Sequence, residues 1–393
     1  MAGVGLVRTP YFVRLLLASW LGRLPFAMAA IAIPLVLRDV DAGYGFIGLA
    51  VGVFAIAAAM GAPVLGRLVD RVGQVSVLAP TAVLAAVGFA AVALAPREPG
   101  AVLVGAFLAG AATPPLEPCL RVLWPDIVGT ERLERAYAVD SAAQEMVFVA
   151  GPLAVAGCVA AVSPVSALWV AAVLGLAGVA VFAPAAPVRR WRAEARAADW
   201  LGPLRSKGLL VLLGSISGVG FAIGVLTVLV VSYAERQPVP GGAPMLLALN
   251  AGGALVGALV YGVITWRGPA RRRAVVCAGG LLFGYGLLAT VPSPLPMAGI
   301  MVLTGLFLAP LLTVTFLLIG ELAPTGTTTE AFAWLITLFA VGNSAGSAIV
   351  GVVLDSAGQH WAAACSAIGT AACLGTLVAG YRLLQPRVMA REV

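Results

Sequence analysis

The stretch that decides the fold is Gly66-Arg67-Leu68-Val69-Asp70-Arg71-Val72-Gly73-Gln74. It is the first densely polar interruption of a mostly apolar sequence, and apolar runs over residues 43–65 and 75–95 flank it. Because each run is long enough to cross a membrane as a helix, the stretch must be a short loop between two helices. Its glycines permit a tight turn and a close approach of helices. Its charges either mark a solvated loop or form a compact structural cluster at the membrane surface.

The composition places the chain among integral membrane proteins. Of its 393 residues, 61% are hydrophobic and only 10% are charged, and the mean hydropathy is +1.03. The apolar runs are continuous and do not alternate at a period of two, which favours helices over a barrel. At about 20 residues per span, the length accommodates roughly twelve transmembrane helices. We expect spans near residues 12–37, 43–65, 75–95, 101–123, 138–161, 165–183, 209–233, 244–265, 274–291, 297–319, 331–354 and 361–383.

The net charge of +7 is distributed as a topology signal. Of the 24 Lys and Arg residues, 20 lie at the chain ends or in alternate connections; Arg38, Arg97 and Arg236 lie in the other connections, and Arg23 lies inside a span. This asymmetry predicts that both termini are cytoplasmic, with anionic membrane lipid and not nucleic acid as the partner of the charge. Abundant Arg, Ala and Gly beside one Lys is typical of a bacterium, so we expect a bacterial plasma (inner) membrane protein.

A longer polar segment, rich in Arg, Ala and Pro, divides the spans six and six. Shifting the sequence by 195 residues places Gly110 on Gly305, Pro115 on Pro310 and Gly151 on Gly346, and a shift of 196 places Gly66 on Gly262. Matches at nearly one offset indicate an internal repeat. We therefore expect an amino-terminal six-helix bundle over 1–184, a cytoplasmic linker over 185–208 and a carboxy-terminal six-helix bundle over 209–393.

The spacing G-x-L-x-D-R-x-G over 66–73, the length and the two six-helix halves resemble the major facilitator superfamily (MFS). The resemblance covers nearly the whole chain and implies an all-α membrane protein in which two pseudo-repeats alternate access to a central cavity. It further implies that Asp70 and nearby arginines hold the end of span two against the start of span eleven. The corresponding conformational residues here are Gly66, Asp70, Arg71, Gly73, Arg121 and Glu330. A helix start offers free N–H groups on which Asp70 can dock.

Four ionisable residues lie clearly inside predicted spans, with Arg121 at the cytoplasmic edge of one, and such a residue costs several kcal/mol unless paired or hydrated. They are Arg23, Glu117, Asp140 and Glu145. All lie in the amino-terminal half, an asymmetry that resembles proton-coupled facilitators. We therefore treat the four as candidates for proton coupling.

Glu145 is the sharpest of these candidates, because it lies about eight residues into the predicted fifth span. A carboxylate that is paired in one state and hydrated in another is what coupling requires. The alternative is a permanent Arg23–Glu145 bridge between spans one and five. For Glu117 the alternative is an i,i+4 pair with Arg121, and for Asp140 it is a structural acid in the first turn of span five.

Gly151, Pro152 and Gly157 resemble part of the glycine–proline signature of facilitator antiporters. The match is incomplete, since position 147 is Val and no arginine occurs over 101–112. The alternative reading is close helix packing with a kink.

The spans lack a cluster of acids and amides typical of a sugar site, which favours a lipophilic substrate. We predict a monomeric secondary transporter that exports a lipophilic drug or metabolite against proton entry. Uptake of a small nutrient by proton symport and an uncoupled lipid scramblase or sensor are the alternatives. One His and the absence of H-E-x-x-H or P-loop spacing argue against an enzyme. The five cysteines lack metal-ligand spacing, so we predict no metal and no cofactor.

Overall fold

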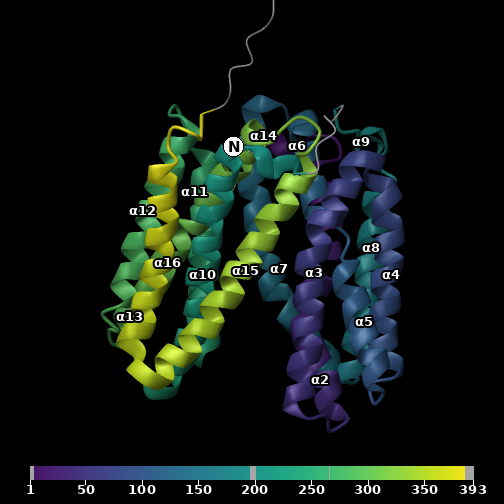
Figure 1. Cartoon of the computed structure of the whole chain (residues 1–393), viewed down its shortest axis with the longest axis vertical. Helices are drawn as coiled ribbons and strands as arrows, with labels where there is room; N and C mark the ends of the chain where they lie inside the picture. Colours follow the sequence, from purple (N-terminus) through teal and green to yellow (C-terminus); the bar gives the residue numbers. More distant parts are fainter. Residues whose placement is uncertain (1–3, 195–200, 265, 386–393) are drawn as a thin grey trace, which may run out of the picture. The chain divides into compact units, whose positions relative to one another are not determined.

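The structure is a computed structural model that describes residues 4–194, 201–264 and 266–385. The described part of the chain is built from helices: α1 (Val4–Val7), α2 (Phe12–Asp39), α3 (Tyr44–Val72), α4 (Gln74–Leu94), α5 (Pro99–Ala111), α6 (Leu116–Val128), α7 (Leu133–Ala161), α8 (Pro164–Phe182), α9 (Ala186–Arg190), α10 (Lys207–Arg236), α11 (Gly242–Val263), α12 (Ala270–Leu288), α13 (Pro294–Leu306), α14 (Leu308–Leu322), α15 (Thr328–Ala357) and α16 (Gln359–Ala379). Short 3₁₀ turns lie over Thr130–Arg132 and Gly202–Arg205. Figure 1 shows these helices in the colours of the sequence.

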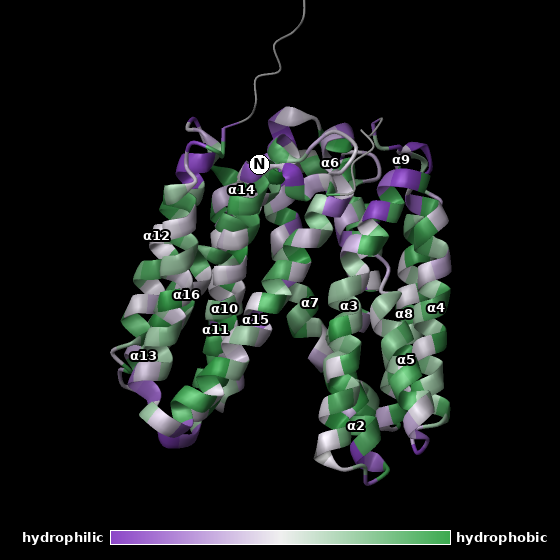
Figure 2. Ribbon diagram, viewed as in Figure 1, coloured by the Kyte–Doolittle hydropathy of each residue, from purple (hydrophilic) through white to green (hydrophobic). Residues whose placement is uncertain are grey.

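Within the described residues, eleven segments are long and apolar enough to cross a membrane, counting α5 with α6 and α13 with α14 as single spans. Helix α12 has 19 residues and differs from these by the arginines of its first turn. Figure 2 shows hydrophobic residues along the helices and hydrophilic residues mainly near their ends. The prediction of an all-α, multi-pass membrane protein is confirmed.

The chain folds into two compact units. Unit 1 holds residues 1–133, 143–197 and 325–333, and unit 2 holds residues 134–142, 198–324 and 334–393. Thus the first residues of α7 belong to unit 2 and the first residues of α15 belong to unit 1. The predicted linker over 185–208 includes residues 195–200, which lie outside the described residues. The division into 1–184 and 209–393 as working halves stays a prediction.

Glycines bring the main helices of each unit close together in corresponding ways. In unit 1, a Cβ on Gly178 of α8 would lie 2.6 Å from the Cα of Gly22 in α2. In unit 2, a Cβ on Gly218 of α10 would lie 2.6 Å from the carbonyl oxygen of Gly369 in α16. Gly22 and Gly218 are 196 residues apart, which is the offset of the sequence repeat. The repeat therefore places a glycine of this kind of close contact at the same position of α2 and α10, although the partner glycines Gly178 and Gly369 are 191 residues apart.

The spacing Gly342-Asn343-Ser344-Ala345-Gly346 fits the G-x-S-x-G pattern of some hydrolases, but here it has a packing role. It lies inside the continuous helix α15 and not on a strand-to-helix turn. A Cβ on either glycine would meet the backbone of α10 at Ser217 or Phe221. The two glycines thus let α15 and α10 pack backbone to backbone.

Three boundaries differ from those expected from the sequence. Helix α3 continues to Val72, so residues 66–72 are its last two turns and not the predicted loop, and only Gly73 separates it from α4.

Helix α6 begins at Leu116 and accommodates Pro118, because this proline falls in its first turn, where no N–H is needed. Helix α6 continues to Val128, and α7 begins before residue 138. The connection to span five is therefore short, and α7 begins at Leu133. Asp140 is then about two turns inside α7 and is not a first-turn acid, which corrects that interpretation. Hydropathy missed this start because the first turn carries Glu134 and Arg135.

Candidate functional site

In unit 1, Asp70 caps the start of α15. Its Oδ1 accepts a hydrogen bond from the backbone N–H of Thr329 (3.2 Å), and its Oδ2 accepts one from that of Glu330 (2.9 Å). These N–H groups have no acceptor within the first turn, and they lie at the positive end of the helix dipole. This is the docking position that the sequence predicts for Asp70.

Arg67 lies one turn before Asp70 and binds the same helix start. Its Nε and Nη2 donate to Oε1 of Glu330 at 3.0 and 2.5 Å. The Glu330 side chain is 1% exposed and that of Arg67 is 32% exposed, so the ion pair closes over a buried carboxylate. We call Arg67, Asp70, Thr329 and Glu330 the α3–α15 contact.

Gly66 makes the α3–α15 contact possible by its lack of a side chain. A Cβ there would lie 2.9 Å from the Cβ of Ala333 and 3.0 Å from the Cα of Glu330. Gly73 ends α3 with φ +89°, a conformation that favours glycine. Arg71, which the resemblance included with this motif, is exposed and lies outside the α3–α15 contact.

Helix α6 also contacts the start of α15. Arg121 is buried, forms an ion pair with Glu117 at 2.5 Å and lies with its Cζ 5.8 Å from the ring centre of Phe332. The i,i+4 pair that we named as the alternative role of Glu117 therefore forms. Behind it, Gln74 donates to the carbonyl of Cys119 at 3.0 Å and ties α4 to α6.

Unit 2 contains a second charged cluster that sequence reasoning missed. Nη2 of Arg273 in α12 donates to Oε1 of Glu134 at the start of α7 (2.7 Å), and its Nη1 donates to the hydroxyl of Tyr261 (2.6 Å). Tyr261 stacks on Trp266 with ring centres 4.7 Å apart. We call Glu134, Tyr261, Trp266 and Arg273 the α7–α12 cluster.

The repeat contained a signal for this cluster. Glu134 and Glu330 are 196 residues apart, at the offset that aligns Gly66 with Gly262. The second copy of the loop lacks an acid of its own, and the acid is supplied by the start of another helix. In both units a carboxylate at the start of a helix binds an arginine from a neighbouring helix.

Near the middle of unit 1, α2 and α7 bring polar groups together. Arg23 is 8% exposed, and its Nη1 donates to Oε1 of Gln144 at 3.1 Å. Glu145 follows in the chain, is half-buried and has no hydrogen bond or ion pair within the described part of the chain. The permanent Arg23–Glu145 bridge is therefore absent from this structure. Asp140 is fully buried but lies in the part of α7 that belongs to unit 2.

The glycine–proline segment of α7 is a packing site at one position only. A Cβ on Gly151 would lie 2.6 Å from the Cβ of Ala27, so α7 approaches α2 closely there. Gly157 has no atom within 4 Å of its Cβ position, and Pro152 lies inside a continuous helix.

Two spans are interrupted at corresponding positions. The helical path breaks over Ala112–Pro115 between α5 and α6, and at Phe307 between α13 and α14. Ala112 and Phe307 are 195 residues apart, at the offset of the repeat. Interrupted spans at matching positions of two repeats are the features that best indicate a substrate path in transporters. The break at Phe307 was not predicted from the sequence, although Pro310, which the repeat aligns with Pro115, lies three residues after it.

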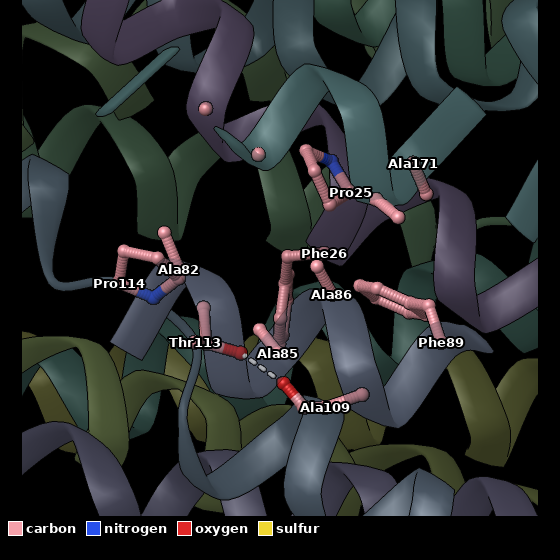
Figure 3. Close-up of a pocket in the computed structure, with 13 residues that line it drawn as sticks. Pro25, Phe26, Ala82, Ala85, Ala86, Phe89, Ala109, Thr113, Pro114 and Ala171 are labelled. Atoms are coloured by element: carbon pink, nitrogen blue, oxygen red, sulfur yellow. Dashed lines mark hydrogen bonds between the residues drawn. The ribbon is translucent and has the colours of Figure 1, made fainter. Parts of the chain in front are cut away.

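The first break opens onto a small pocket inside unit 1, shown in Figure 3. Its lining is almost wholly apolar and includes Pro25, Phe26, Phe89 and Pro114. Thr113 bonds its own helix, donating from Oγ1 to the carbonyl of Ala109 at 3.0 Å (Figure 3).

These features agree with the comparison with known families. The model of the Major Facilitator Superfamily matches residues 15–324, which is most of the chain. The chain belongs to the Major Facilitator Superfamily. It is therefore a multi-pass membrane protein of a family of secondary transporters, whose members bind small-molecule substrates. The resemblance inferred from residues 66–73 is confirmed.

Solved structures of MFS transporters share this fold at low sequence identity. A bacterial homologue of the iron transporter ferroportin, in an outward-facing state, is 14% identical with a TM-score of 0.77, covering 94% of this chain and 99% of that one. The human organic anion transporter MFSD10 is 17% identical (TM-score 0.69; 95% and 98% covered). The fucose:proton symporter of E. coli is also 17% identical (TM-score 0.68; 93% and 97% covered). No curated protein sequence matches the chain.

Proposed function

We propose that this MFS member is a proton-coupled exporter of a lipophilic drug or metabolite that works by alternating access. The observation that carries the proposal is Glu145, a half-buried carboxylate with no ion-pair partner among the described residues. It is 12 residues, or about 18 Å of helical rise, from the start of α7. An ionisable group at that depth is expensive in a structural role, so a functional role is the default hypothesis.

Glu145 would carry the proton, and Arg23 and Gln144 would tune its charge. A carboxylate that is protonated on one side of the membrane and ionised on the other supplies the coupling. Glu117 is the weaker candidate because it is committed to Arg121. Asp140 is a second carboxylate that could take part.

The α3–α15 contact and the α7–α12 cluster would act as latches. Each holds the first turn of a helix in one unit, while the rest of that helix belongs to the other unit. During the conformational change of alternating access, these contacts must therefore either move with their helices or break. We propose that they form in one state and break in the other.

The choice of a lipophilic substrate is supported by the sequence, because the spans lack a cluster of acids and amides typical of a sugar site. We further propose that the protein is a monomer in a bacterial plasma membrane and that it exports its substrate. Both of its termini would be cytoplasmic. The two working halves would be 1–184 and 209–393, with 185–208 as the linker.

Proton coupling is tested with purified protein in liposomes that contain a pH-sensitive dye. Lipophilic cations, anions and neutral compounds are added outside to wild type, to Glu145→Gln and to a control, Glu131→Gln, whose side chain is exposed. We expect substrate-evoked proton movement in wild type and in the control, and its loss in Glu145→Gln. Equal proton movement in all three would remove Glu145 from the mechanism and leave Asp140 as the next candidate.

Proton symport of a small nutrient is the second candidate. The polar pair Arg23–Gln144 could bind hydroxyl groups, and it is the observation that favours this reading. Proton and substrate moving in the same direction would select symport over export. Lipid flipping without either movement would select an uncoupled scramblase.

A further inference from the structure

The start of α12 carries positive charge that the protein only partly compensates. Its first turn contains Arg271, Arg272 and Arg273, with no acidic residue. Pro269 precedes the helix and provides no side-chain cap. The free N–H groups and the helix dipole add further positive charge at this point. Of these three arginines, only Arg273 has a carboxylate partner among the described residues, and that partner is Glu134.

Arg271 is held in a fixed position without an acceptor. Its Cζ lies 4.8 Å from the ring centre of Tyr381, which follows α16. Its Nε and Nη1 are buried, and neither has a hydrogen-bond partner within residues 4–194, 201–264 and 266–385. Leaving buried donors of a charged group unsatisfied is costly. An anion beside this guanidinium would compensate its charge.

Arg272 stands at the end of an apolar stripe. Arg272, Val276 and Phe283 are spaced by four and seven residues, so they lie on one face of α12. Val276 is 61% and Phe283 is 63% exposed, and Arg272 is also exposed. On a membrane-spanning helix, exposed apolar side chains of this kind contact acyl chains. The arginine therefore lies where the stripe reaches the depth of the lipid headgroups.

We propose that the start of α12 binds an anionic phospholipid, with the phosphate at Arg271 and Arg272 and an acyl chain along Val276 and Phe283. A free phosphate would satisfy the arginines but would leave the apolar stripe unused. The continuity of charge and stripe on one helix thus favours a lipid over a soluble anion. Arginines at a membrane surface attract anionic lipids electrostatically, whereas zwitterionic lipids carry no net charge and gain no such attraction.

Spin-labelled phosphatidylglycerol tests this site. The labelled lipid is a minor component of phosphatidylcholine vesicles that hold the purified protein, and electron paramagnetic resonance measures its motionally restricted fraction. Labelled phosphatidylcholine gives the reference. The variant is Arg271→Gln with Arg272→Gln. The control is Arg189→Gln with Arg190→Gln, an exposed pair on α9 that removes the same charge.

We expect wild type and the α9 control to select phosphatidylglycerol, and the α12 variant to lose selectivity by about fivefold or more. Replacing both α12 arginines by lysine should retain part of it, which shows that a loss does not arise from misfolding. An equal loss of phosphatidylglycerol selectivity in the α9 control would mean that selectivity depends on the general surface charge. This result would overturn the proposed site. Displacement of the labelled lipid by millimolar inorganic phosphate would identify a soluble-anion site and overturn the lipid assignment.

Discussion

Asp70 is the residue whose charge matters most at the α3–α15 contact. Asp70→Asn keeps the shape but removes the charge, and its NH2 group cannot accept from the second backbone N–H, so one of two hydrogen bonds, each worth about 1.5–3 kcal/mol when an ion accepts, is lost. We expect a loss of about 1–2 kcal/mol from the latched state, which shifts the conformational equilibrium roughly tenfold. Transport in liposomes should slow by a similar factor, while thermal unfolding changes little. Arg71→Gln, outside the contact, is the control. Normal transport by folded Asp70→Asn would contradict the latch.

Gly66 tests the same contact through shape alone. Gly66→Ala places a Cβ against the backbone of Glu330, and overpacking of this kind costs about 1–3 kcal/mol. We expect transport to fall as in Asp70→Asn. Gly52→Ala is the matched control, because the same helix leaves open space at that position. If both variants transport equally well, the close approach of the helices at Gly66 is not needed for transport.

At the scale of elements, the two latches should be equivalent. Glu134→Gln replaces the Arg273–Glu134 ion pair by a hydrogen bond to a neutral amide oxygen, so the start of α7 is held more weakly. We expect transport to slow as it does when the α3–α15 contact is weakened. The double exchange Glu134→Arg with Arg273→Glu should restore part of the rate, and a rate equal to that of the single variant would show that pairing is irrelevant. Glu131→Gln, just before α7, is the control.

The interrupted spans show how neighbouring residues and helices determine where a helix breaks. The break over Ala112–Pro115 contains Pro114 and Pro115, which cannot donate the backbone hydrogen bonds of a continuous helix. The equivalent break at Phe307 lies three residues before Pro310, whose missing N–H leaves the carbonyl of Leu306 without its helical partner. The break at Phe307 also packs against Gly280 of α12, where a Cβ would lie 2.5 Å from the Phe307 ring. This contact joins residues distant in sequence, which no local pattern records.

At the scale of the whole molecule, the distribution of Arg and Lys predicts the orientation in the membrane. We expect green fluorescent protein fused to the carboxy terminus to be fluorescent and alkaline phosphatase at the same position to be inactive, because both ends are cytoplasmic. Alkaline phosphatase fused after Arg97 in a truncated chain should be active. The reverse pattern would invert the topology and, with it, the side on which the latches lie.

The sequence by itself determined the class of protein. Apolar runs of membrane length, the motif over 66–73 and the repeat near 195 residues were sufficient for an all-α MFS member, because hydrophobic length and glycine spacing are local properties. The position of Asp70 at the start of span eleven followed from the family resemblance together with the free N–H groups of a helix start.

Tertiary structure alone decided which charges meet. Arg67 reaches Glu330 across 263 residues, and Arg273 reaches Glu134 across 139. It also separated Arg23 from Glu145 by giving the arginine an amide partner, Gln144. Pairing depends on the rotation and end points of helices, and a shift of α7 by a few residues was enough to move Asp140 out of the first turn. Hydropathy locates a span but not its facing side, so the partners of buried charges emerge only when the helices are packed.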